Sequence, residues 1–535
     1  MSGPPEARSS GASEEAVRPL TVAGLARGLE ARGFAVTLRG LEGEGRPLLN
    51  VRQDSRDVSD GDLFLAWKGA RHDAHDFVAE VAERGAAAAL VEDFVEGAGI
   101  PQLRVTEGRA AAAVAAMLVL GDPASGMRVT AVTGTNGKTT TALLVRHLLG
   151  ARSPAAALGT LGVVGPDGDV RKGTGGLTTP GPVELANRVR GLAGEGVREL
   201  VLEASSHALD QRRLDGLQVD IAAFTNLTRE HLDYHGTMAD YRAAKGRLLA
   251  LLSKEAEVVV YAGDPAWREL PPVEVPVRPV GIEGEAMPGV PESRERRPAL
   301  VARNLTLSGT GARFDLGEEG GEEVHPVHLP LLGRFNVENA LVAAGVAMAA
   351  GHPLEAVALG LSGVAAPVGR MEVAFTEPVP VILDYAHTPD ALARALETLR
   401  PLYPGRLIVV FGAGGDRDRT KRPEMGRVAT VGAALAIVTS DNPRTEDPEA
   451  IVDDIVAGMP AAEEGRRWMR VTDRREAMAR ALRVARPGDA VLLAGKGHET
   501  YQIVGTEVRD FDERVVLQDL LRELRSGFET EGDGS

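Results

Sequence analysis

Short runs of apolar, β-branched residues alternate along the chain with longer segments in which apolar residues recur at helical spacing. The clearest runs cover residues 129–133, 199–202, 258–261, 381–383, 407–411, 435–438 and 490–493. Such alternation is typical of parallel sheets that are covered by helices. The pattern therefore predicts an α/β protein.

Two turn-rich segments, Gly121–Gly126 and Ala365–Gly369, divide this pattern because they concentrate glycine and proline. The 535 residues exceed what one hydrophobic core usually serves, so we expect several domains. The predicted domains are an N-terminal one at 17–126, a central one at 127–366 and a C-terminal one at 367–526. We expect disordered tails at 1–16 and 527–535, and a surface loop at 281–298, which is polar and rich in Gly and Pro.

Composition narrows the class of protein. The formal net charge is −16, which argues against a general nucleic-acid or anionic-membrane binder, because binding a polyanion needs clustered positive charge. The absence of cysteine excludes disulfides, thiolate metal sites and cysteine nucleophiles. The most apolar stretches are too short to span a membrane, and the first 16 residues lack the apolar core of a signal peptide. We therefore expect a cytosolic enzyme.

Lysine is rare, with only seven among the 60 basic residues. A lysine kept in such a chain can serve where arginine cannot, as a compact charge or as an amine nucleophile. Lys138, Lys245, Lys421 and Lys496 all lie inside motif-like runs.

The first of these runs is a candidate phosphate loop. The strand-like run at 129–133 leads into Gly-Thr-Asn-Gly-Lys-Thr-Thr at 134–140, and a helical pattern follows. A glycine-rich turn between a strand and a helix directs backbone N–H groups and the helix N-terminus at an anion. We expect Lys138 to reach the β- and γ-phosphates and the Thr139 hydroxyl to bind Mg²⁺. The common motif has another glycine where this chain has Val132.

The shortened loop Gly-Thr-Asn-Gly-Lys-Thr resembles that of the Mur ligases and their folylpolyglutamate synthase relatives. Further motifs at 203–209, 225–236, 333–340, 384–390 and 441–444 resemble the MurE type of this family, which adds the third amino acid to UDP-N-acetylmuramoyl-L-alanyl-D-glutamate. The resemblance runs from Asp54 to Arg514. It implies an N-terminal uridine-binding α/β domain, a central P-loop ATPase-like parallel sheet and a C-terminal Rossmann-like domain.

An ATP-driven amide ligase phosphorylates a carboxylate, so catalysis depends on positioning and on neutralising two anions. Glu203 directly follows an apolar strand, where a carboxylate could hold Mg²⁺ with Thr139. The resemblance adds His231 as the ligand of a second metal ion and Lys245 as a lysine that reacts with CO₂ to give an anionic carbamate able to bind Mg²⁺. Without the resemblance, the sequence pattern predicts that Lys245 is an exposed residue of an amphipathic helix. The expected catalytic residues are Lys138, Glu203, His231 and Lys245.

The resemblance also implies the substrate contacts. For ATP they are Gly134, Thr135, Asn136, Gly137, Lys138, Thr139, Thr140, Asn336, Arg370 and Asp384. For the UDP-sugar dipeptide they are Gln53, Ser55, Ala70, Arg71, His72, Thr178, Thr179, Ser205, Gln211 and Arg213. Two departures from the family pattern put single contacts in doubt, namely Tyr261-Ala262-Gly263-Asp264 in place of Asn-Ala-Asp-Asp and Leu177 in place of Asn.

The amine to be added is predicted from the C-terminal domain. Arg417, Arg444 and Glu499 each follow an apolar strand, so they should gather at the carboxyl ends of one parallel sheet, where such folds bind ligands. A cationic fork and a nearby anion suit the distal carboxylate and ammonium of meso-diaminopimelate. The resemblance implies the set Arg417, Asp441, Asn442, Pro443, Arg444, Gly495 and Glu499.

Alternatives remain within and outside the family. The other ligase candidates add lysine or D-alanyl-D-alanine. A phosphate-loop switch or motor should carry an Asn-Lys-x-Asp base-specificity motif, which is absent. As a ligase of peptidoglycan precursor synthesis, the chain is expected to act as a cytoplasmic monomer on the UDP-linked dipeptide and diaminopimelate, with ATP and Mg²⁺, and without nucleic acid or membrane insertion.

Overall fold

The computed structural model describes residues 19–69, 72–171, 177–366 and 368–532. Two compact units share the chain. Unit 1 contains the residues up to Gly134 together with Arg152–Ala222 and Arg229–Glu257, and unit 2 contains Thr135–Ala151, Ala223–Thr228 and Val258 onward. The three predicted domain boundaries remain predictions.

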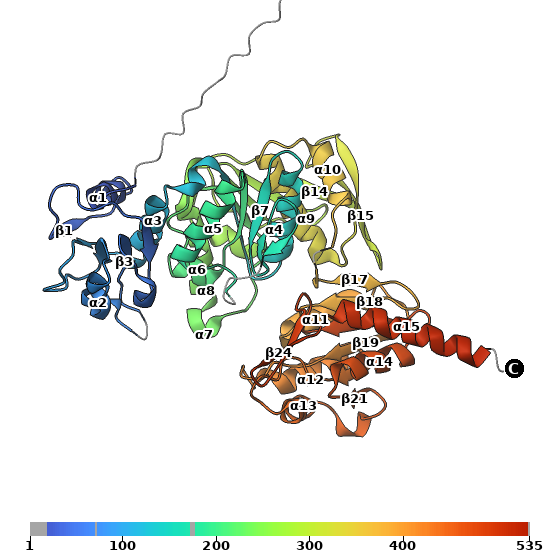
Figure 1. Cartoon of the computed structure of the whole chain (residues 1–535). Helices are drawn as coiled ribbons and strands as arrows, with labels where there is room; N and C mark the ends of the chain where they lie inside the picture. The colour runs from blue at the N-terminus through green and yellow to red at the C-terminus, as the bar shows by residue number, and fades with distance from the viewer. Residues whose placement is uncertain (1–18, 70–71, 172–176, 367, 533–535) are drawn as a thin grey trace, which may run out of the picture. The chain divides into compact units, whose positions relative to one another are not determined.

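The N-terminal part of unit 1 is a five-stranded sheet of order β1-β5-β4-β3-β2 in which only β1 is antiparallel to its neighbour. Its strands are β1 (Thr37–Arg39), β2 (Asn50–Arg52), β3 (Asp62–Leu65), β4 (Ala88–Val91) and β5 (Gln102–Arg104). The helices are α1 (Val22–Glu30), α2 (Val78–Glu83) and α3 (Gly108–Val119) (Figure 1). The alanine-rich α3 is almost wholly buried, since short side chains allow close packing.

The second sheet of unit 1 has the strand order β11-β6-β10-β7-β8-β9. Its strands are β6 (Arg128–Thr133), β7 (Ala155–Gly159), β8 (Gly162–Val164), β9 (Val170–Arg171), β10 (Glu199–Glu203) and β11 (Val219–Phe224). Its helices are α5 (Pro182–Gly194), α6 (Ser206–Asp210), α7 (Leu232–His235) and α8 (Met238–Gly246). β10 is parallel to β6 and β7, and Glu203 lies opposite Val132 in the register. The candidate carboxylate and the phosphate loop therefore follow neighbouring strand ends.

β12 (Leu252–Tyr261) begins in unit 1 and continues into unit 2, where the strand order is β16-β15-β14-β13-β12. The other strands are β13 (Val277–Ile282), β14 (Leu300–Ser308), β15 (Gly311–Glu318) and β16 (Val324–Leu329). The helices are α4 (Lys138–Gly150), α9 (Arg334–Ala349) and α10 (Leu354–Ser362). The predicted loop at 281–298 begins with two residues of β13 and is otherwise free of named helices and strands.

The C-terminal part of unit 2 is a six-stranded sheet of order β17-β18-β22-β19-β20-β21, parallel except for β17. Its strands are β17 (Glu372–Phe375), β18 (Val381–Asp384), β19 (Leu407–Phe411), β20 (Leu435–Val438), β21 (Trp468–Arg470) and β22 (Ala490–Ala494), and a separate hairpin pairs β23 (Tyr501–Val504) with β24 (Glu507–Asp510). Two apolar cores cover opposite faces. One involves α11 (Pro389–Leu399), α12 (Lys421–Gly432) and α13 (Pro448–Val456), and the other α14 (Arg474–Val484) and α15 (Glu513–Gly532). Helices on both faces of a parallel sheet confirm the predicted α/β class.

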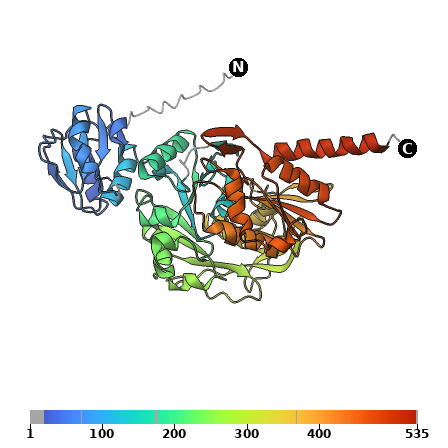
Figure 2. The ribbon, with the colours of Figure 1, turned by 90° about the horizontal axis from the view of Figure 1, so that it is seen from below.

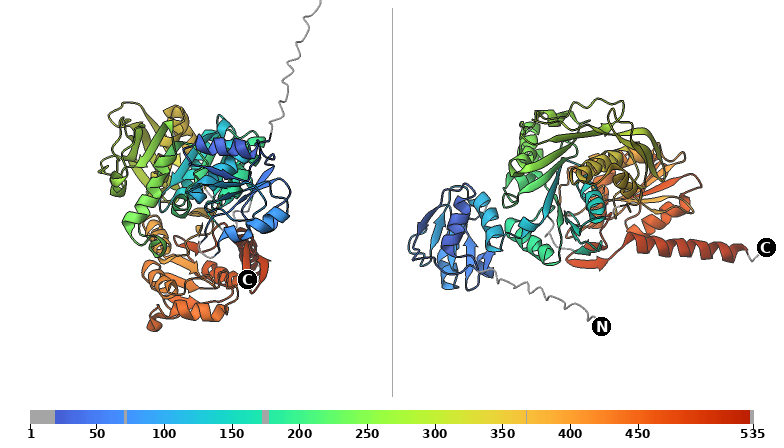
Figure 3. Two further views of the ribbon diagram at one scale, coloured as in Figure 1. Left: turned by 90° about the vertical axis from the view of Figure 1, so that its left-hand side faces the viewer. Right: turned by 90° about the horizontal axis from the view of Figure 1, so that it is seen from above.

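Helix α15 continues into the segment that was predicted as a C-terminal tail. The helix is anchored in the core by Leu517, Leu520 and Leu521 and is assigned as far as Gly532, and Figures 2 and 3 show it running on past the strands of its sheet. The disordered tail at 527–535 remains a prediction. The N-terminal tail lies outside the described residues. Among the helices that are described, none is long and apolar enough to cross a membrane.

Candidate functional site

The phosphate loop has the predicted strand–turn–helix geometry. β6 ends at Thr133, and α4 begins at Lys138, whose Nζ donates to the Thr135 carbonyl at 2.7 Å. Gly137 has a φ of 84°, and a Cβ there would lie 2.1 Å from Asn339 Oδ1. Only glycine fits this position, because both the backbone conformation and the approach of Asn339 exclude a side chain.

A second loop, residues 225–228, holds the phosphate loop in place. The amides of Thr135 and Asn136 donate to the carbonyl and the Oδ1 of Asn226, at 2.7 and 3.0 Å. In the opposite direction, Thr225 Oγ1 donates to the Asn136 carbonyl at 2.7 Å and the Thr228 amide to Thr135 Oγ1 at 2.9 Å. These bonds join residues some 90 positions apart, so they left no local sequence signal.

Asp264 fixes the 225–228 loop in turn. Its carboxylate accepts from the Leu227 amide at 2.6 Å and from the Ala266 amide at 3.0 Å, and the buried Trp267 donates to the Thr225 carbonyl. The turn that departs from the family pattern thus supports the phosphate loop indirectly. Tyr261, which departs from the pattern together with Gly263, is buried at the end of β12, and burial raises the pKa of its hydroxyl.

Asn336 is buried at the start of α9. Its Nδ2 donates to the Leu332 carbonyl at 2.8 Å, and its Oδ1 accepts from Asn339 at 3.2 Å. The predicted nucleotide contact of Asn336 remains a prediction, and the structure shows that its amide also supports Asn339, the residue that approaches Gly137.

The carboxylate of Glu203 is 3% exposed and ordered by the Thr160 turn. Oε1 accepts from the Thr160 amide at 2.9 Å and Oε2 from the Thr160 hydroxyl at 3.1 Å. A Cβ on Gly159 would lie 2.0 Å from Oε1, so the glycine leaves room for this carboxylate. Sequence analysis missed Thr160, because nothing in its surroundings marks it as functional.

Lys245 is 1% exposed and not the surface residue that an amphipathic helix would present. Its Nζ donates to the Gly134 carbonyl at 2.7 Å and lies 4.4 Å from the centre of the Tyr241 ring. Lys245 and the first residue of the phosphate loop are therefore in direct contact.

Aromatic rings surround this region. The His231 ring lies 4.7 Å from that of His207 and 6.2 Å from that of Tyr241, between centroids. His235 is hydrogen-bonded to Ser206, and burial lowers the pKa of both His207 and His235. The His231 ring and the Lys245 amine therefore both lie near the Tyr241 ring. Of the residues described, no three His, Asp or Glu side chains form a group suited to a metal ion, so a site here would also need the Lys245 carbamate or the substrate.

The predicted dipeptide-binding residues of the central part share one hydrogen-bond network. Thr179 Oγ1 donates to the Glu203 carbonyl at 2.6 Å and accepts from the Ser205 amide at 3.1 Å. Arg213 donates to the Thr179 carbonyl at 2.7 Å and to Gln211, and Thr178 accepts from Thr160.

In the N-terminal part, Gln53 lies near this network, since a Cβ on Gly181 would be 3.7 Å from its Oε1. Asp54 caps the turn that contains Ser55 by accepting from the Arg56 amide. His72 is exposed, and Ala70 and Arg71 lie outside the described residues.

The predicted amine-binding residues lie at the carboxyl ends of β19, β20 and β22. Two loops carry most of them, the 412–418 loop after β19 and the 441–446 loop after β20. Arg444 Nη1 donates to the Gly415 carbonyl at 2.8 Å, and Gly415 N donates to the Asn442 carbonyl at 2.9 Å. The structure thus brings Arg444 to the loop that contains Arg417.

Glu499 is already paired. Its Oε2 accepts from Asn442 Nδ2 at 2.7 Å and lies 3.3 Å from Nζ of the fully buried Lys496. Asp441 is 7% exposed, and its Oδ2 lacks a hydrogen-bond partner among the described groups, while a Cβ on Gly495 would lie 2.6 Å from it. This carboxylate oxygen is therefore buried against Gly495, and the predicted contacts of Asp441 and Gly495 with the amine remain predictions.

The two predicted nucleotide contacts of this domain lie together. Asp384 accepts from the Met371 amide at 2.8 Å, and burial raises the pKa of its carboxyl. The Arg370 guanidinium lies 4.8 Å from the centre of the Tyr385 ring. His387 Nδ1 donates to the Tyr385 carbonyl at 2.8 Å, and burial lowers the pKa of its imidazole.

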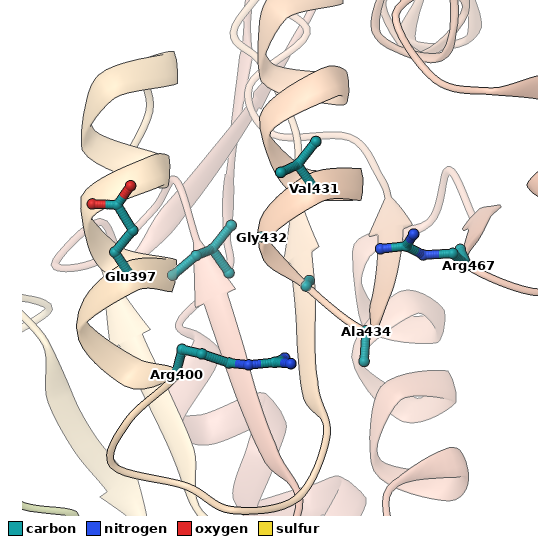
Figure 4. Close-up of a pocket in the computed structure, with 8 residues that line it drawn as sticks. Glu397, Arg400, Val431, Gly432, Ala434 and Arg467 are labelled. Carbon is teal, nitrogen blue, oxygen red and sulfur yellow. The ribbon is translucent and has the colours of Figure 1, made fainter.

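A pocket of about 550 Å³ lies elsewhere in the C-terminal part (Figure 4). Its lining includes Glu397, Arg400, Val431 and Arg467. Residues 431–434 precede β20, so this pocket is at the amino end of the strand whose carboxyl end leads to Arg444. It does not contain any predicted site residue.

Comparisons with known proteins show which family models, relatives and solved structures this chain matches. Family models described as "Mur ligase family, catalytic domain", "Mur ligase middle domain" and "Mur ligase, glutamate ligase domain" match residues 49–118, 132–347 and 369–497.

Two similar relatives carry the name UDP-N-acetylmuramoyl-L-alanyl-D-glutamate–2,6-diaminopimelate ligase. The one from Geobacter metallireducens is 41% identical over 88% of this chain and 94% of its own length. The one from Gloeobacter violaceus is 40% identical over 91% of this chain and 97% of its own. A solved structure of that ligase is similar at a TM-score of 0.64 and 33% identity, covering 91% and 97% of the two chains. A MurF ligase of Thermotoga maritima, solved with ADP, shares the fold at a TM-score of 0.54 and 19% identity.

Proposed function

Because the chain belongs to the Mur ligase family, we propose that it adds meso-diaminopimelate to UDP-N-acetylmuramoyl-L-alanyl-D-glutamate with ATP. The observation that carries the proposal is the 40–41% identity to diaminopimelate ligases along nearly their whole length. The grouping of Arg417, Arg444 and Glu499 after strands of one sheet supports it. A lysine-adding or D-alanyl-D-alanine-adding enzyme is not favoured.

The reaction has two steps. A substrate carboxylate attacks the γ-phosphorus of ATP, so that an acyl phosphate forms and ADP leaves. The amine then attacks the acyl carbon, inorganic phosphate leaves and the amine loses a proton. Lys138, at the start of α4, would neutralise phosphate charge where the helix N-terminus adds its own positive potential.

The donors near the phosphate loop fit Mg²⁺, because Glu203 and Thr139 supply the oxygen ligands that this ion prefers. We propose that both hold one Mg²⁺ ion, that His231 is the ligand of a second metal ion, and that a Lys245 carbamate supplies further oxygen ligands. Mg²⁺ would supply charge neutralisation during phosphoryl transfer. The buried Glu203 carboxylate, oriented by Thr160, is the observation that supports this assignment.

The decisive assay measures phosphate release with the UDP-linked dipeptide and ATP, adding meso-diaminopimelate, L-lysine or D-alanyl-D-alanine in turn. Release that depends on diaminopimelate alone, with the tripeptide product seen by mass spectrometry, is expected. Preference for either other amine would refute the proposal. The UDP-linked tripeptide would be an intermediate of cytoplasmic peptidoglycan precursor synthesis. Sedimentation of the active enzyme would separately test whether it acts as a monomer.

Replacing Lys138 by alanine is expected to remove phosphoryl transfer, lowering kcat by at least about 10³-fold, because its ammonium neutralises charge that develops in the transition state.

Glu203→Gln should retain ATP binding and lose Mg²⁺-dependent turnover. Turnover against Mg²⁺ concentration and ATP binding by calorimetry check both. Glu195→Gln, at an exposed ion pair with Arg171, is the matched control. Normal turnover of Glu203→Gln at ordinary Mg²⁺ would show that the metal is held elsewhere.

A further inference from the structure

Arg422 is a fully buried cation near the amine-binding loops. It occupies the second position of α12, and its side chain is 0% exposed. A guanidinium removed from water must be paired and hydrogen-bonded, or its burial is costly. The partners of Arg422 therefore show what the residue holds together.

Those partners come from both loops. Arg422 Nη2 donates to the Gly414 carbonyl of the 412–418 loop at 3.3 Å and to Glu446 Oε1 of the 441–446 loop at 2.8 Å. Nη1 donates to Glu446 Oε2 at 3.0 Å and to Asp454 of α13 at 2.8 Å. The bidentate contact with Glu446 fixes the distance and the angle between the two groups.

Glu446 continues the connection. Its Oε1 also accepts from the Asp416 amide at 2.6 Å, and the hydrogen bond from Arg422 lowers the pKa of its carboxyl to about 2. Asp416 in turn accepts from the Thr445 hydroxyl at 2.8 Å. The two loops are therefore joined through a carboxylate that stays ionised at neutral pH.

The joined segments have little freedom to relax. Asp416 and Arg444 have φ values of 53° and 51°, which lie in the left-handed region that residues other than glycine seldom adopt. A Cβ on Gly415 would lie 1.9 Å from the Pro443 carbonyl oxygen. Arg444 is itself one of these constrained residues and Arg417 directly follows the other, so their backbone positions depend on the contact between the loops.

We propose that Arg422 and Glu446 are positioning residues that set the amine selectivity of the enzyme by holding Arg417 and Arg444 in register. This inference rests on the proposed function for the identity of the amine. Neither residue needs to touch the substrate. The guanidinium of Arg422 is buried, and Glu446 acts through its hydrogen bonds with Arg422 and the Asp416 amide.

The test uses the full-length Arg422→Lys and Glu446→Gln variants. Lysine keeps the charge of Arg422 and loses its planar fork, and glutamine keeps the shape of Glu446 and loses its charge. For both variants we expect the KM for meso-diaminopimelate to rise about tenfold or more, since charge-assisted hydrogen bonds are lost. The preference for diaminopimelate over L-lysine should fall, while the KM values for ATP and the UDP-linked dipeptide stay within about twofold.

Arg406→Lys is the matched control, because Arg406 makes a similar forked pair with Asp489 before β19, at the opposite ends of the strands. An equal rise in all three KM values, an unchanged preference for diaminopimelate, or the same effects in Arg406→Lys would overturn the proposal. Should Arg422→Lys fail to fold, Glu446→Gln decides alone. Should the unmutated chain use another amine, the proposed function fails, and the same variants assayed with that amine still decide the role of Arg422.

Discussion

Ligation is expected to fall below detection in the Lys245→Arg variant, although arginine keeps the positive charge. The lysine amine can lose its proton and add CO₂ to become an anionic carbamate, whereas the arginine guanidinium stays protonated and cannot. The Lys245 amine lies against the Gly134 carbonyl at the start of the phosphate loop. In the unmutated enzyme, removing bicarbonate and CO₂ should lower activity, and adding them back should restore it. A ¹³C carbamate signal from enzyme kept in labelled bicarbonate would identify the modified group.

The control for this prediction is Lys254→Arg, which alters an exposed lysine of β12 and should leave ligation and bicarbonate dependence unchanged. Because Lys245 is buried, thermal unfolding of Lys245→Arg must be measured alongside. A folded Lys245→Arg enzyme with full activity would refute the carbamate.

L-lysine is expected to be used about 10³-fold less efficiently than meso-diaminopimelate, measured as kcat/KM. Lysine lacks the distal carboxylate, so Arg444 would remain desolvated without its anionic partner, and sites built for a polar group reject analogues that lack it. Arg444 is suited to this role because one of its Nη atoms is held by the Gly415 carbonyl.

Arg444→Ala should lose most of this discrimination, chiefly by lowering kcat/KM for diaminopimelate. Arg427→Ala, which removes an exposed arginine paired with Glu424 on α12, is the control and should discriminate like the unmutated enzyme. Equal use of the two amines by the unmutated chain, or full discrimination by Arg444→Ala, would contradict the assignment of Arg444.

Much of the fold could be predicted because buried parallel strands leave a continuous apolar signal. The strands at 407–411 and 435–438 have the predicted bounds, and the strand–turn–helix around Lys138 was predicted from glycine and lysine spacing. Short strands of the N-terminal sheet, such as β1 with all three residues exposed, have too few buried positions to produce such a pattern.

The candidate site was predictable where a residue follows a strand or belongs to a family motif, as for Glu203 and Arg444. The supporting residues were missed. Thr160, Asp264 and Arg422 act through hydrogen bonds to loops distant in the sequence, and neither periodicity nor spacing encodes such contacts. The only local signal for Arg422 was its place next to Lys421, one of the seven lysines, a few residues after the 412–418 loop.

The bonds between the 225–228 loop and the phosphate loop bear on how nucleotide binding is driven. Since the Thr135 and Asn136 amides already donate to Asn226, we expect other groups of these two residues and the remaining N–H groups of the loop to bind phosphate. The turn is already ordered before the nucleotide binds. Binding therefore does not carry the loss of backbone conformational entropy that ordering a flexible loop would require. Hydrogen exchange at these two amides should consequently be slow before any nucleotide is present and change little when ADP is added, so affinity would arise mainly from charge and not from folding of the loop.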